Sequence, residues 1–482
     1  MPDAMAPSDR RALKGRGSAP DLVVVGAGSA GFAAAIRAAE LGAAVTLIGH
    51  GTIGGTCVNV GCVPSKTLIR AVEALHGARA AARFAGVVAS AALDDWRAVI
   101  GQKNELVLSL RRAKYLDVLR QHDRISYVEG RARLTVEGVD VNGTLIKSPR
   151  TVIVTGASPA APSIAGIDDV DWLTSTTALA LERLPKSLLI IGGGFVGCEL
   201  GQMFARAGVA VTIVCRTRLL AEAEPEIGAR LTEYLGAEGI QVRCGVAYEA
   251  IRQTARGIAL TLRRTDRAAD VLDAERVLVA IGRRPNTAGL GLAELGVALA
   301  DDGGIRVDDR MRTTRCGVYA AGDVTGRDLF VYMAAYGAKM AAENALNGDL
   351  RRYDNAAMPS VVFTDPQVAS VGLTVASARA RGIDAATSTI DLGQVPRALA
   401  ARDARGLVML VAERGSGTLL GAHMLAPEAG DSIQTATLAI KQGLTVSDLA
   451  ETIFPYLTTV EALKLAALGF SRDIATLSCC AG

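Results

Sequence analysis

The same order of apolar and polar runs occurs twice along this chain. The stretch "DLVVVGAGSAGFAAAIRAAELGAAVTLIG", which begins at Asp21, has an apolar run, a glycine-rich turn, an amphipathic run of helical period and a second apolar run. This order predicts a strand, a turn, a helix and a second strand, which form one βαβ unit. The stretch "KSLLIIGGGFVGCELGQMFARAGVAVTIVCR", from Lys186, repeats it. Two such units predict two doubly wound, Rossmann-like α/β domains.

The pattern of the remaining chain differs from these units. A charged helical stretch is predicted over about 93–119, and "ISYVEGRARLTVEGVDV" alternates as antiparallel strands do. The segment "CGVYAAGDVT" predicts a short buried strand that ends in Gly-Asp, before a long alanine-rich helix. From about Asn355, strands such as "LVMLVAE" precede amphipathic helices such as "DSIQTATLAIKQ". This last segment is predicted to be a separate α+β domain.

The composition limits the kinds of molecule that the protein is expected to bind. The 482 residues carry 52 Lys and Arg against 49 Asp and Glu, a balance that provides no basic field for nucleic acid or an anionic membrane. Apolar runs are too short to span a bilayer, and the first 20 residues lack the apolar centre of a secretory signal, so we expect them to be disordered. We therefore expect a cytoplasmic protein that binds small molecules. The chain has eight cysteines, and in a reducing cytoplasm thiols tend to be redox-active or metal-binding rather than to form structural disulfides.

Both βαβ units carry the spacing G-x-G-x-x-G between strand and helix. Such a turn lets backbone amides and the helix N-terminus approach a pyrophosphate. A glycine turn without a ligand is the alternative interpretation, but two matches in the required setting disfavour it. The glycines are Gly26, Gly28 and Gly31 in the first unit and Gly192, Gly194 and Gly197 in the second.

The residue that usually grips a ribose, an acid at the end of the next strand, is missing from both units. The second unit has Arg216 and Arg218 there, which favours the 2′-phosphate of NADP, although two arginines at a strand end are also compatible with solvated surface charge. We therefore predict NADPH rather than NADH.

The stretch "GGTCVNVGCVPSKTLIR" places Cys57 and Cys62 five positions apart, just before a predicted helix. A helix N-terminus lowers the pKa of a thiol, and Lys66 would add to this effect, so the pair is predicted to be reactive. Half of a zinc site is the alternative, but no Cys or His pair at zinc spacing completes it. The other internal cysteines are predicted to be small buried residues: Cys198, Cys215, Cys244 and Cys316.

These motifs, with "GRRPN" and "YAAGD", resemble the flavoprotein pyridine nucleotide-disulfide oxidoreductases. The resemblance implies FAD on the first unit, NADPH on the second and a C-terminal α+β dimerisation domain. The implied boundaries are 1–20 for the disordered segment, 21–152 and 284–354 for the FAD-binding domain, 153–283 for the NADPH-binding domain, and 355–482 for the dimerisation domain with its tail.

The resemblance also implies roles for single residues. Asp323 would hold the ribityl chain, and Glu199 would partner the lysine near the flavin. Gly49 stands at the usual position of the ribose-binding acid, so FAD must be held there in another way, and Phe195 stands where many members have a gating tyrosine. The remaining implied residues around the flavin are Thr56 and Lys66, with backbone near Gly51, Ala132 and Val331.

The proton donor of the family is absent from its expected segment. Where members that reduce disulfides have a histidine oriented by a glutamate, "FPYLTTVEALKLAA" has Tyr456, followed by Glu461. A phenol with a pKa of about 10 protonates a thiolate poorly, and His423 lies in a strand-like stretch. The segment therefore disfavours a disulfide substrate and favours one that needs thiolate ligands and electrons, which is typical of a soft metal ion.

The final residues, "SCCAG", supply two more sulfurs. Cys479 and Cys480 are predicted to catch a soft ion and to pass it by ligand exchange to Cys57 and Cys62. With "FTDPQVASVG" and "VPRALA", the ending resembles the branch of the family that reduces Hg(II) to Hg(0). This implies thiol-complexed Hg(II) as substrate and a homodimer in which the tail of one subunit serves the active site of the other.

Three further expectations complete the sequence analysis. The first 20 residues contain no cysteine, so an N-terminal metal-carrier domain is not expected and delivery would rely on the tail or on outside thiols. A thioredoxin reductase-like enzyme, or another flavoprotein disulfide reductase, is the alternative function. A protein that binds metal without turnover is a second alternative, although it would not need two dinucleotide motifs.

Overall fold

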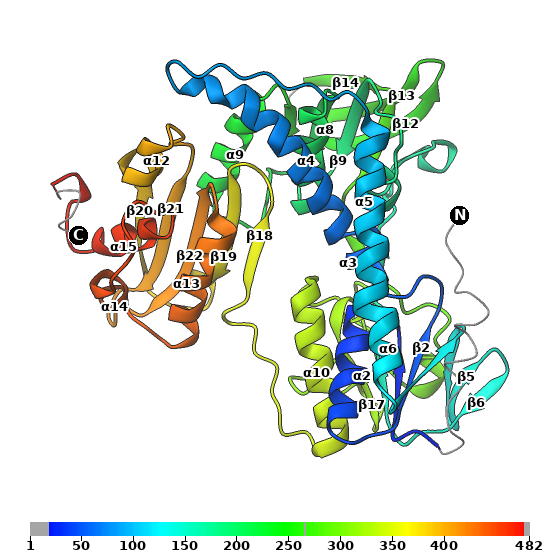
Figure 1. The fold of residues 1–482 in the computed structure, drawn as a ribbon. Coiled ribbons are helices and arrows are strands. Elements are labelled where there is room, and N and C mark those ends of the chain that lie inside the picture. Colours follow the sequence, from blue (N-terminus) through cyan, green and yellow to red (C-terminus); the bar gives the residue numbers. More distant parts are fainter. Residues whose placement is uncertain (1–18, 265–266, 477–482) are drawn as a thin grey trace. The chain divides into compact units, whose positions relative to one another are not determined.

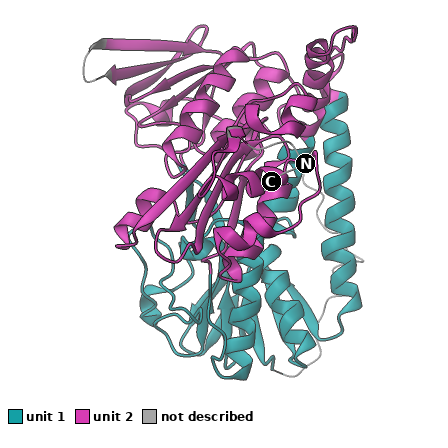
Figure 2. Ribbon diagram, turned by 90° about the vertical axis from the view of Figure 1, so that its left-hand side faces the viewer, with its two compact units in different colours: residues 1–67, 98–160, 282–354 teal, residues 68–97, 161–281, 355–482 magenta. Residues whose placement is uncertain are grey.

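The computed structural model describes residues 19–264 and 267–476. The chain forms two compact units, each built from three separate segments (Figure 2). Unit 1 comprises residues 1–67, 98–160 and 282–354, and unit 2 comprises residues 68–97, 161–281 and 355–482. Among the described helices, none is both long enough and apolar enough to cross a membrane.

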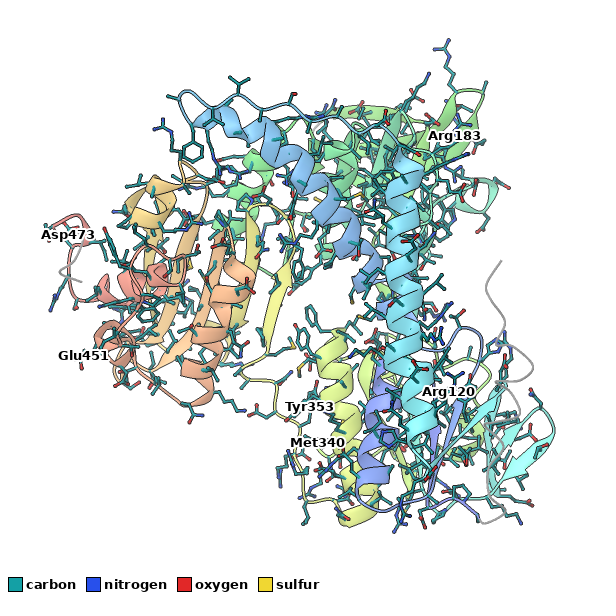
Figure 3. The ribbon with its side chains drawn as sticks, in the orientation of Figure 1. Arg120, Arg183, Met340, Tyr353, Glu451 and Asp473 are labelled. Atoms are coloured by element: carbon teal, nitrogen blue, oxygen red, sulfur yellow. The ribbon has the colours of Figure 1, made fainter. Side chains whose placement is uncertain are left out.

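Unit 1 contains a parallel sheet with the strand order β17-β7-β1-β2-β3. Its strands are β1 (Leu22–Val25), β2 (Val45–Gly49), β3 (Ile125–Glu129), β7 (Thr151–Ile153) and β17 (Val318–Ala320). All four residues of β1 are buried, because helices and loops cover both faces of a parallel sheet. The helices α2 (Ser29–Glu40) and α10 (Val331–Asn347) pack side by side on one face (Figure 1). Met340 of α10 is buried in this core, and Tyr353 packs against it (Figure 3).

Smaller elements complete unit 1. A three-stranded antiparallel sheet comprises β4 (Ala132–Thr135), β5 (Gly138–Val141) and β6 (Thr144–Ile146), and a short ribbon pairs β8 (Ala157–Pro159) with β16 (Arg283–Pro285). The prediction of antiparallel strands was therefore right for residues 132–141 and wrong for β3, which extends the parallel sheet. The predicted charged helix is α5 (Trp96–Arg111), which continues through the π-helix Arg112–Leu116 into α6 (Asp117–Gln121).

Unit 2 contains the second parallel sheet, with the order β11-β10-β9-β15. Its strands are β9 (Ser187–Ile191), β10 (Ala210–Cys215), β11 (Gln241–Cys244) and β15 (Arg276–Val279). The helix α8 (Phe195–Arg206) joins β9 to β10, and α9 (Pro225–Ala237) joins β10 to β11. An antiparallel sheet follows, formed by β12 (Ala247–Thr254), β13 (Gly257–Arg264) and β14 (Arg267–Ala274).

The C-terminal part of unit 2 is the predicted α+β segment. Its antiparallel sheet has the order β18-β19-β22-β21-β20, and three helices pack against or beside it. The strands are β18 (Pro359–Val362), β19 (Gln367–Gly372), β20 (Ala385–Asp391), β21 (Leu407–Glu413) and β22 (Leu419–Ala426). The helices are α13 (Ala429–Lys441), α14 (Val446–Glu451) and α15 (Glu461–Leu468). Two Rossmann-like sheets and an α+β segment confirm the predicted fold class.

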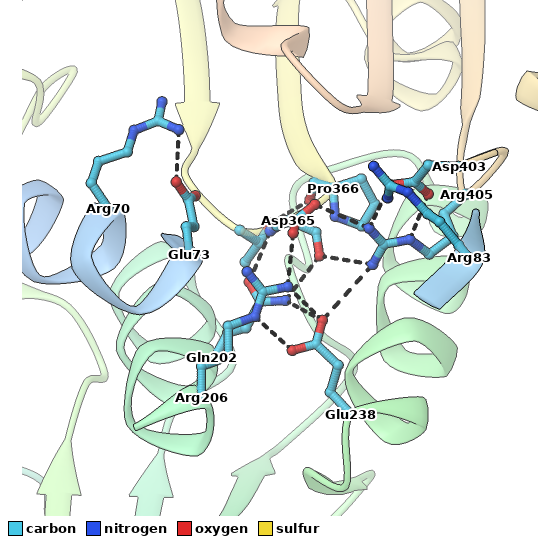
Figure 4. A network of polar contacts seen from close by, with 11 residues as sticks. Arg70, Glu73, Arg83, Gln202, Arg206, Glu238, Asp365, Pro366, Asp403 and Arg405 are labelled. Carbon is cyan, nitrogen blue, oxygen red and sulfur yellow. Dashed lines mark hydrogen bonds and ion pairs between the residues drawn. The ribbon is translucent and has the colours of Figure 1, made fainter. Parts of the chain in front are cut away.

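An ionic network around the buried Arg206 ties helix α8 to the C-terminal segment of unit 2 (Figure 4). Arg206 of α8, whose side chain is 4% exposed, donates two hydrogen bonds to Glu238 and one, 2.8 Å long, to Asp365. Arg405 bonds the other oxygen of Asp365 and forms a two-pronged pair with Asp403. Bidentate pairs of this kind fix geometry as well as charge, so the network holds α8 against the loop between β18 and β19.

Candidate active site and nucleotide-binding turns

The glycine turn of unit 1 is shaped for a ligand. Gly26 has a φ of +124°, and a Cβ there would lie 2.3 Å from the carbonyl oxygen of Val154. A Cβ on Gly31 would lie 1.7 Å from the oxygen of Gly26, so α2 packs against the turn as only glycine allows. By contrast, a Cβ on Gly28 would meet nothing closer than 3.4 Å. A side chain at Gly28 would therefore only touch the backbone of Gly55, in ordinary van der Waals contact, and the glycine turn as a whole fits a pyrophosphate.

The turn of unit 2 repeats the relations of the first and third glycines. Gly192 has a φ of +119°, with a Cβ contact of 2.3 Å to the oxygen of Ala280, and a Cβ on Gly197 would lie 2.0 Å from the oxygen of Gly192. A Cβ on Gly194 would meet no described atom within 4 Å. In the described chain, no side chain caps the N-terminus of α2 or α8, and neither first turn holds an acid. Both helix N-termini therefore fit an anionic phosphate group.

The strand end at Gly49 explains why no acid stands there. A Cβ on Gly49 would lie 2.6 Å from the Cβ of Ala27 and 2.7 Å from the hydroxyl of Tyr127. Tyr127 is 6% exposed, and burial raises the pKa of its hydroxyl to about 12. Its phenol therefore occupies the space that a side chain at position 49 would need.

The two arginines predicted for the 2′-phosphate differ in their surroundings. Arg216 follows β10 directly and is exposed. The guanidinium of Arg218 donates to the carbonyls of Leu220, Ala221 and Ala223, at distances of 2.6–3.1 Å. Arg216 is thus better placed to meet a ligand, while Arg218 organises the loop beneath it.

The cysteine pair lies where a short helix meets a long one. Cys57 is in α3 (Gly55–Val60), and Cys62 begins α4 (Cys62–Ala80). Cys57 shares a hydrogen bond with Cys62, and this bond, together with burial, raises the pKa of Cys57. Lys66 acts in the predicted direction and lowers it, but its effect is the smallest, so the expectation of a lowered pKa is wrong for Cys57.

Arg283 is a residue of this site that the sequence analysis did not single out. It donates to the hydroxyl of Thr56 at 3.5 Å, bonds the carbonyl of Ala157, and pairs with Asp323 across 3.8 Å. Burial lowers the pKa of Arg283, and the nearby Asp323 and Cys62 oppose that change. The motif "GRRPN", which contains Arg283, was the signal that could have identified it.

Asp323 has the properties of a ligand for hydroxyl groups. It lies in a short 3-10 helix, Gly322–Thr325, and its side chain is 23% exposed. Burial raises the pKa of its carboxyl group, and Arg283 only partly offsets this. A half-buried carboxylate whose ion pair is long retains acceptor capacity, which fits a ribityl chain.

Two tyrosines complete the surroundings of the cysteines. Tyr115 shares a 3.1 Å hydrogen bond with Ser29, at the start of α2, and its ring meets Phe32 edge to face at 4.8 Å. The pKa of Tyr115 is raised by burial, with added contributions from Cys57 and Cys62. Tyr332, at the start of α10, is 44% exposed, and its pKa is also raised, by burial, Asp328 and Cys62.

The remaining residues predicted around the flavin are distributed over both units. In unit 1, Gly51 follows β2 in an exposed turn, Ala132 begins β4 and Val331 begins α10. In unit 2, Glu199 is buried within α8, where its Oε1 accepts a 3.0 Å hydrogen bond from the backbone amide of Phe363. This contact lies within unit 2, whereas Lys66 belongs to unit 1.

The C-terminal candidates lie in unit 2. Tyr456 is 47% exposed and stands before α15. Glu461 begins α15, is 9% exposed, and accepts a 3.2 Å hydrogen bond from the amide of Leu457, so it braces the loop that carries Tyr456. Burial raises the pKa of Glu461. Cys479 and Cys480 lie outside the described residues.

The structure gives the surroundings of His423 and of the four cysteines that were predicted to be buried. His423 is 1% exposed within β22, and one ring nitrogen bonds the carbonyl of Leu373 at 3.0 Å, so it is a core residue. Cys198 and Cys215 are buried as predicted. Cys244 is only half-buried, and Cys316 is exposed, so the prediction of burial is wrong for both.

Comparison with known families assigns this architecture. The model of the pyridine nucleotide-disulphide oxidoreductases matches residues 20–347, and the model of the dimerisation domain of these proteins matches residues 358–467. The chain therefore belongs to the pyridine nucleotide-disulphide oxidoreductase family, and it carries the dimerisation domain.

Individual relatives show which branch of the family this chain resembles. The chain is 48% identical to a mercuric reductase of Streptomyces lividans, over 96% of this chain and 98% of that protein. It is 44% identical to a mercuric reductase of Bacillus cereus, over 96% of this chain and 73% of that protein. The predicted resemblance to the mercury-reducing branch is thus confirmed.

Solved structures share the fold over nearly the whole chain. The Cu(II) complex of the HOCl-induced flavoprotein disulfide reductase RclA from Escherichia coli has a TM-score of 0.82 and 29% identity, and covers 94% of this chain and 99% of that chain. LpdA from Mycobacterium tuberculosis has a TM-score of 0.82 and 25% identity, with coverage of 94% and 100%.

Proposed function

We propose that this protein reduces Hg(II) to Hg(0) with electrons from NADPH, through FAD and the Cys57–Cys62 pair. The observation that carries the proposal is a hydrogen-bonded pair of thiols, one in α3 and one at the start of α4, in a chain that has Tyr456 at the expected position of the proton donor. The identity of up to 48% with mercuric reductases supports the same reaction. We further propose that the enzyme works in the cytoplasm.

Unit 1 would hold FAD, and unit 2 would hold NADPH. The glycine turn at Gly26 and Gly28 and the acceptor capacity of Asp323 fit FAD, and the open space at Gly194 with the exposed Arg216 fits NADPH. When bound, the two cofactors would supply the hydride and the electron-carrying chemistry that the cysteine pair needs. The chain itself binds the metal ion, orients it and controls protons.

The two thiols suit a soft cation better than a disulfide substrate. Thiolates are the preferred ligands of soft metal ions, and a metal displaces the protons of the thiols that it binds. The raised pKa of Cys57 means that this thiol holds its proton until a metal arrives. Arg283 adds positive charge near Cys62 and so favours the thiolate form of that residue.

Tyr456 and the tail would deliver the substrate. A phenol is a poor acid at neutral pH, so Tyr456 would contact the metal ion or its thiol ligands rather than protonate a leaving thiolate. Glu461 would keep the loop of Tyr456 in place through its bond to Leu457. We also propose that Cys479 and Cys480 of one subunit of a homodimer accept thiol-complexed Hg(II) and transfer it to Cys57 and Cys62 of the other.

The first experiment measures NADPH consumption and volatile mercury together. Purified FAD-loaded protein should oxidise NADPH and release Hg(0) when given Hg(II) bound to cysteine. Cys57→Ala and Cys62→Ala should each abolish both signals, while Cys316→Ala, which changes an exposed thiol, should retain them. Consumption of NADPH with a thioredoxin-type disulfide, and none with Hg(II), would support the alternative reductase instead.

Tyr456 is tested separately. The variant Tyr456→Phe should lower mercury turnover and leave the flavin spectrum unchanged, because only the hydroxyl is removed from a half-exposed side chain. Full turnover in this variant would remove the hydroxyl from the mechanism.

A subunit-mixing experiment tests the shared site. One subunit carries Cys57→Ala with an intact tail, and the other carries Cys479→Ala and Cys480→Ala with intact Cys57 and Cys62. If the tail serves the partner, the mixed dimer regains turnover of bulky thiol complexes that neither parent dimer handles. If the tail serves its own subunit, mixing restores nothing.

A further inference from the structure

Two cysteines outside the proposed active site face each other at the carboxyl ends of neighbouring strands. Cys215 ends β10 and Cys244 ends β11, and the parallel register pairs them directly. The Sγ of Cys215 donates a hydrogen bond to the Sγ of Cys244 across 3.0 Å. Adjacent strands lie about 4.8 Å apart, within the span of about 4.4–6.8 Å between Cα atoms that a disulfide bridges. The backbone therefore already permits a bond between these sulfurs.

The two thiols have different environments. Cys215 is 5% exposed, whereas Cys244 is half-buried. The hydrogen bond from Cys215 lowers the pKa of Cys244 to about 7, and the same bond, with burial, raises the pKa of Cys215. An accessible thiolate beside a protonated partner is the arrangement of an attacking and a resolving cysteine.

The geometry favours a covalent bond over a metal ion. A two-coordinate ion with metal–sulfur bonds of about 2.3 Å would hold its sulfurs about 4.6 Å apart. These sulfurs are already at 3.0 Å, and among the described residues no cluster of three or more Cys, His, Asp or Glu side chains is placed to hold a metal.

We propose that Cys215 and Cys244 are a second oxidisable dithiol, which peroxides convert to an intramolecular disulfide beside the glycine turn of unit 2. The Cys244 thiolate attacks one peroxide oxygen, the O–O bond breaks, and a sulfenic acid and hydroxide form. The Cys215 sulfur then attacks the sulfenic sulfur, and the second oxygen leaves as water after taking up a proton. Each sulfur gives up one electron in total, and the two electrons reduce the two peroxide oxygens.

The bond would change the neighbouring turn. A Cβ on Gly193 would lie 3.3 Å from the sulfur of Cys215, so this sulfur packs directly against the glycine turn. Cys215 also immediately precedes Arg216. Bond formation pulls the Cys215 sulfur toward β11 and away from this contact. If unit 2 holds NADPH, as proposed above, oxidation should weaken NADPH binding reversibly.

The test uses peptide mapping of the full-length enzyme. After reduction and removal of the reductant, the protein is treated with hydrogen peroxide, alkylated and digested. We expect a linked peptide pair containing Cys215 and Cys244, which a dithiol reductant separates. Recovery of both residues as alkylated thiols, under conditions that oxidise Cys57 and Cys62, would overturn the proposal.

Binding of NADP+, which involves no turnover, gives a second readout. Peroxide should raise the dissociation constant of the wild type several-fold and should leave Cys244→Ser unaffected, while Cys316→Ser should respond like the wild type. If Cys244→Ser does not fold, Cys244→Ala or Cys215→Ser replaces it. Equal responses in wild type and the Cys244 variant, or retention of Hg(II) by this pair without any disulfide, would refute the switch. Neither readout depends on mercury turnover, so failure of the proposed function remains distinguishable.

Discussion

Alanine at position 194 would test the nucleotide site of unit 2 without disturbing the fold. Gly194 has φ −82° and ψ −169°, which any L residue adopts, and its Cβ would meet no described atom within 4 Å. The substitution should cost at most about 1 kcal/mol of unfolding free energy, as expected at a helix N-cap. The new methyl group would, however, occupy the space through which a pyrophosphate approaches the start of α8.

The expected loss of affinity follows from the contacts removed. A hydrogen bond from a backbone amide to a charged group contributes about 1.5–3 kcal/mol. At about 1.4 kcal/mol per factor of ten, losing one such bond raises the dissociation constant for NADPH by about 10- to 150-fold. FAD content should stay at the wild-type level, because Gly194 belongs to unit 2 and the FAD turn to unit 1.

The assay combines NADP+ titration, flavin absorbance and thermal unfolding. Gly236→Ala is the matched control, because it makes the same change in the same unit, near the end of α9, with no described atom within 4 Å of the new Cβ. Gly28→Ala is the reciprocal variant, which should impair FAD retention and spare NADP+ binding. Wild-type NADP+ affinity in Gly194→Ala would refute the placement of the pyrophosphate at this turn.

Three further predictions concern stability. Arg206→Met removes one of the two arginines that pair with the partly buried Glu238 and Asp365, and it should cost about 1–3 kcal/mol because Arg405 remains. Arg352→Met, which breaks a pair whose arginine side chain is 67% exposed, should cost at most about 1 kcal/mol in the same thermal scan. Burial lowers the pKa of His423 below its usual value, so at acidic pH the unfolded chain binds a proton that the folded chain does not. The free energy of unfolding should therefore fall as the pH drops below about 6.5. In His423→Gln, the free energy of unfolding should depend less on pH over this range. Gly49→Glu, which restores an acid, should lower stability without improving FAD retention, because its Cβ would collide with Tyr127; a stable variant with tighter FAD binding would contradict this.

The sequence was sufficient where a local pattern determines structure. Strand, glycine turn and helix were predicted for both units because their periodicity and glycine spacing are contained within about 30 residues. The Cys57–Cys62 pair was equally local. The absence of an acid at position 49 was noticed, but its cause was not, because Tyr127 reaches Gly49 only through the pairing of β2 with β3.

Features that depend on contacts between distant parts of the chain could not be predicted from the sequence. Arg283 meets Thr56 across more than 200 residues of chain, and no local pattern indicates that contact. The pairing of Cys215 with Cys244 depends on the register between β10 and β11. The raised pKa of Cys57 was missed for the same reason. The effects of the helix N-terminus and of Lys66 could be anticipated from the sequence, but the larger effect of the hydrogen bond between the two thiols could be seen only in the structure.

The likeness of the two glycine turns has a consequence for cofactor choice. The first and third glycines meet backbone oxygens at nearly the same distances in both units, so these positions do not distinguish one dinucleotide from the other. Discrimination must instead come from what borders each turn: a closed, phenol-filled strand end at Gly49 and an open, cationic one at Arg216. An engineer who wished to exchange the preferred nucleotide would redesign these borders and leave the glycines alone.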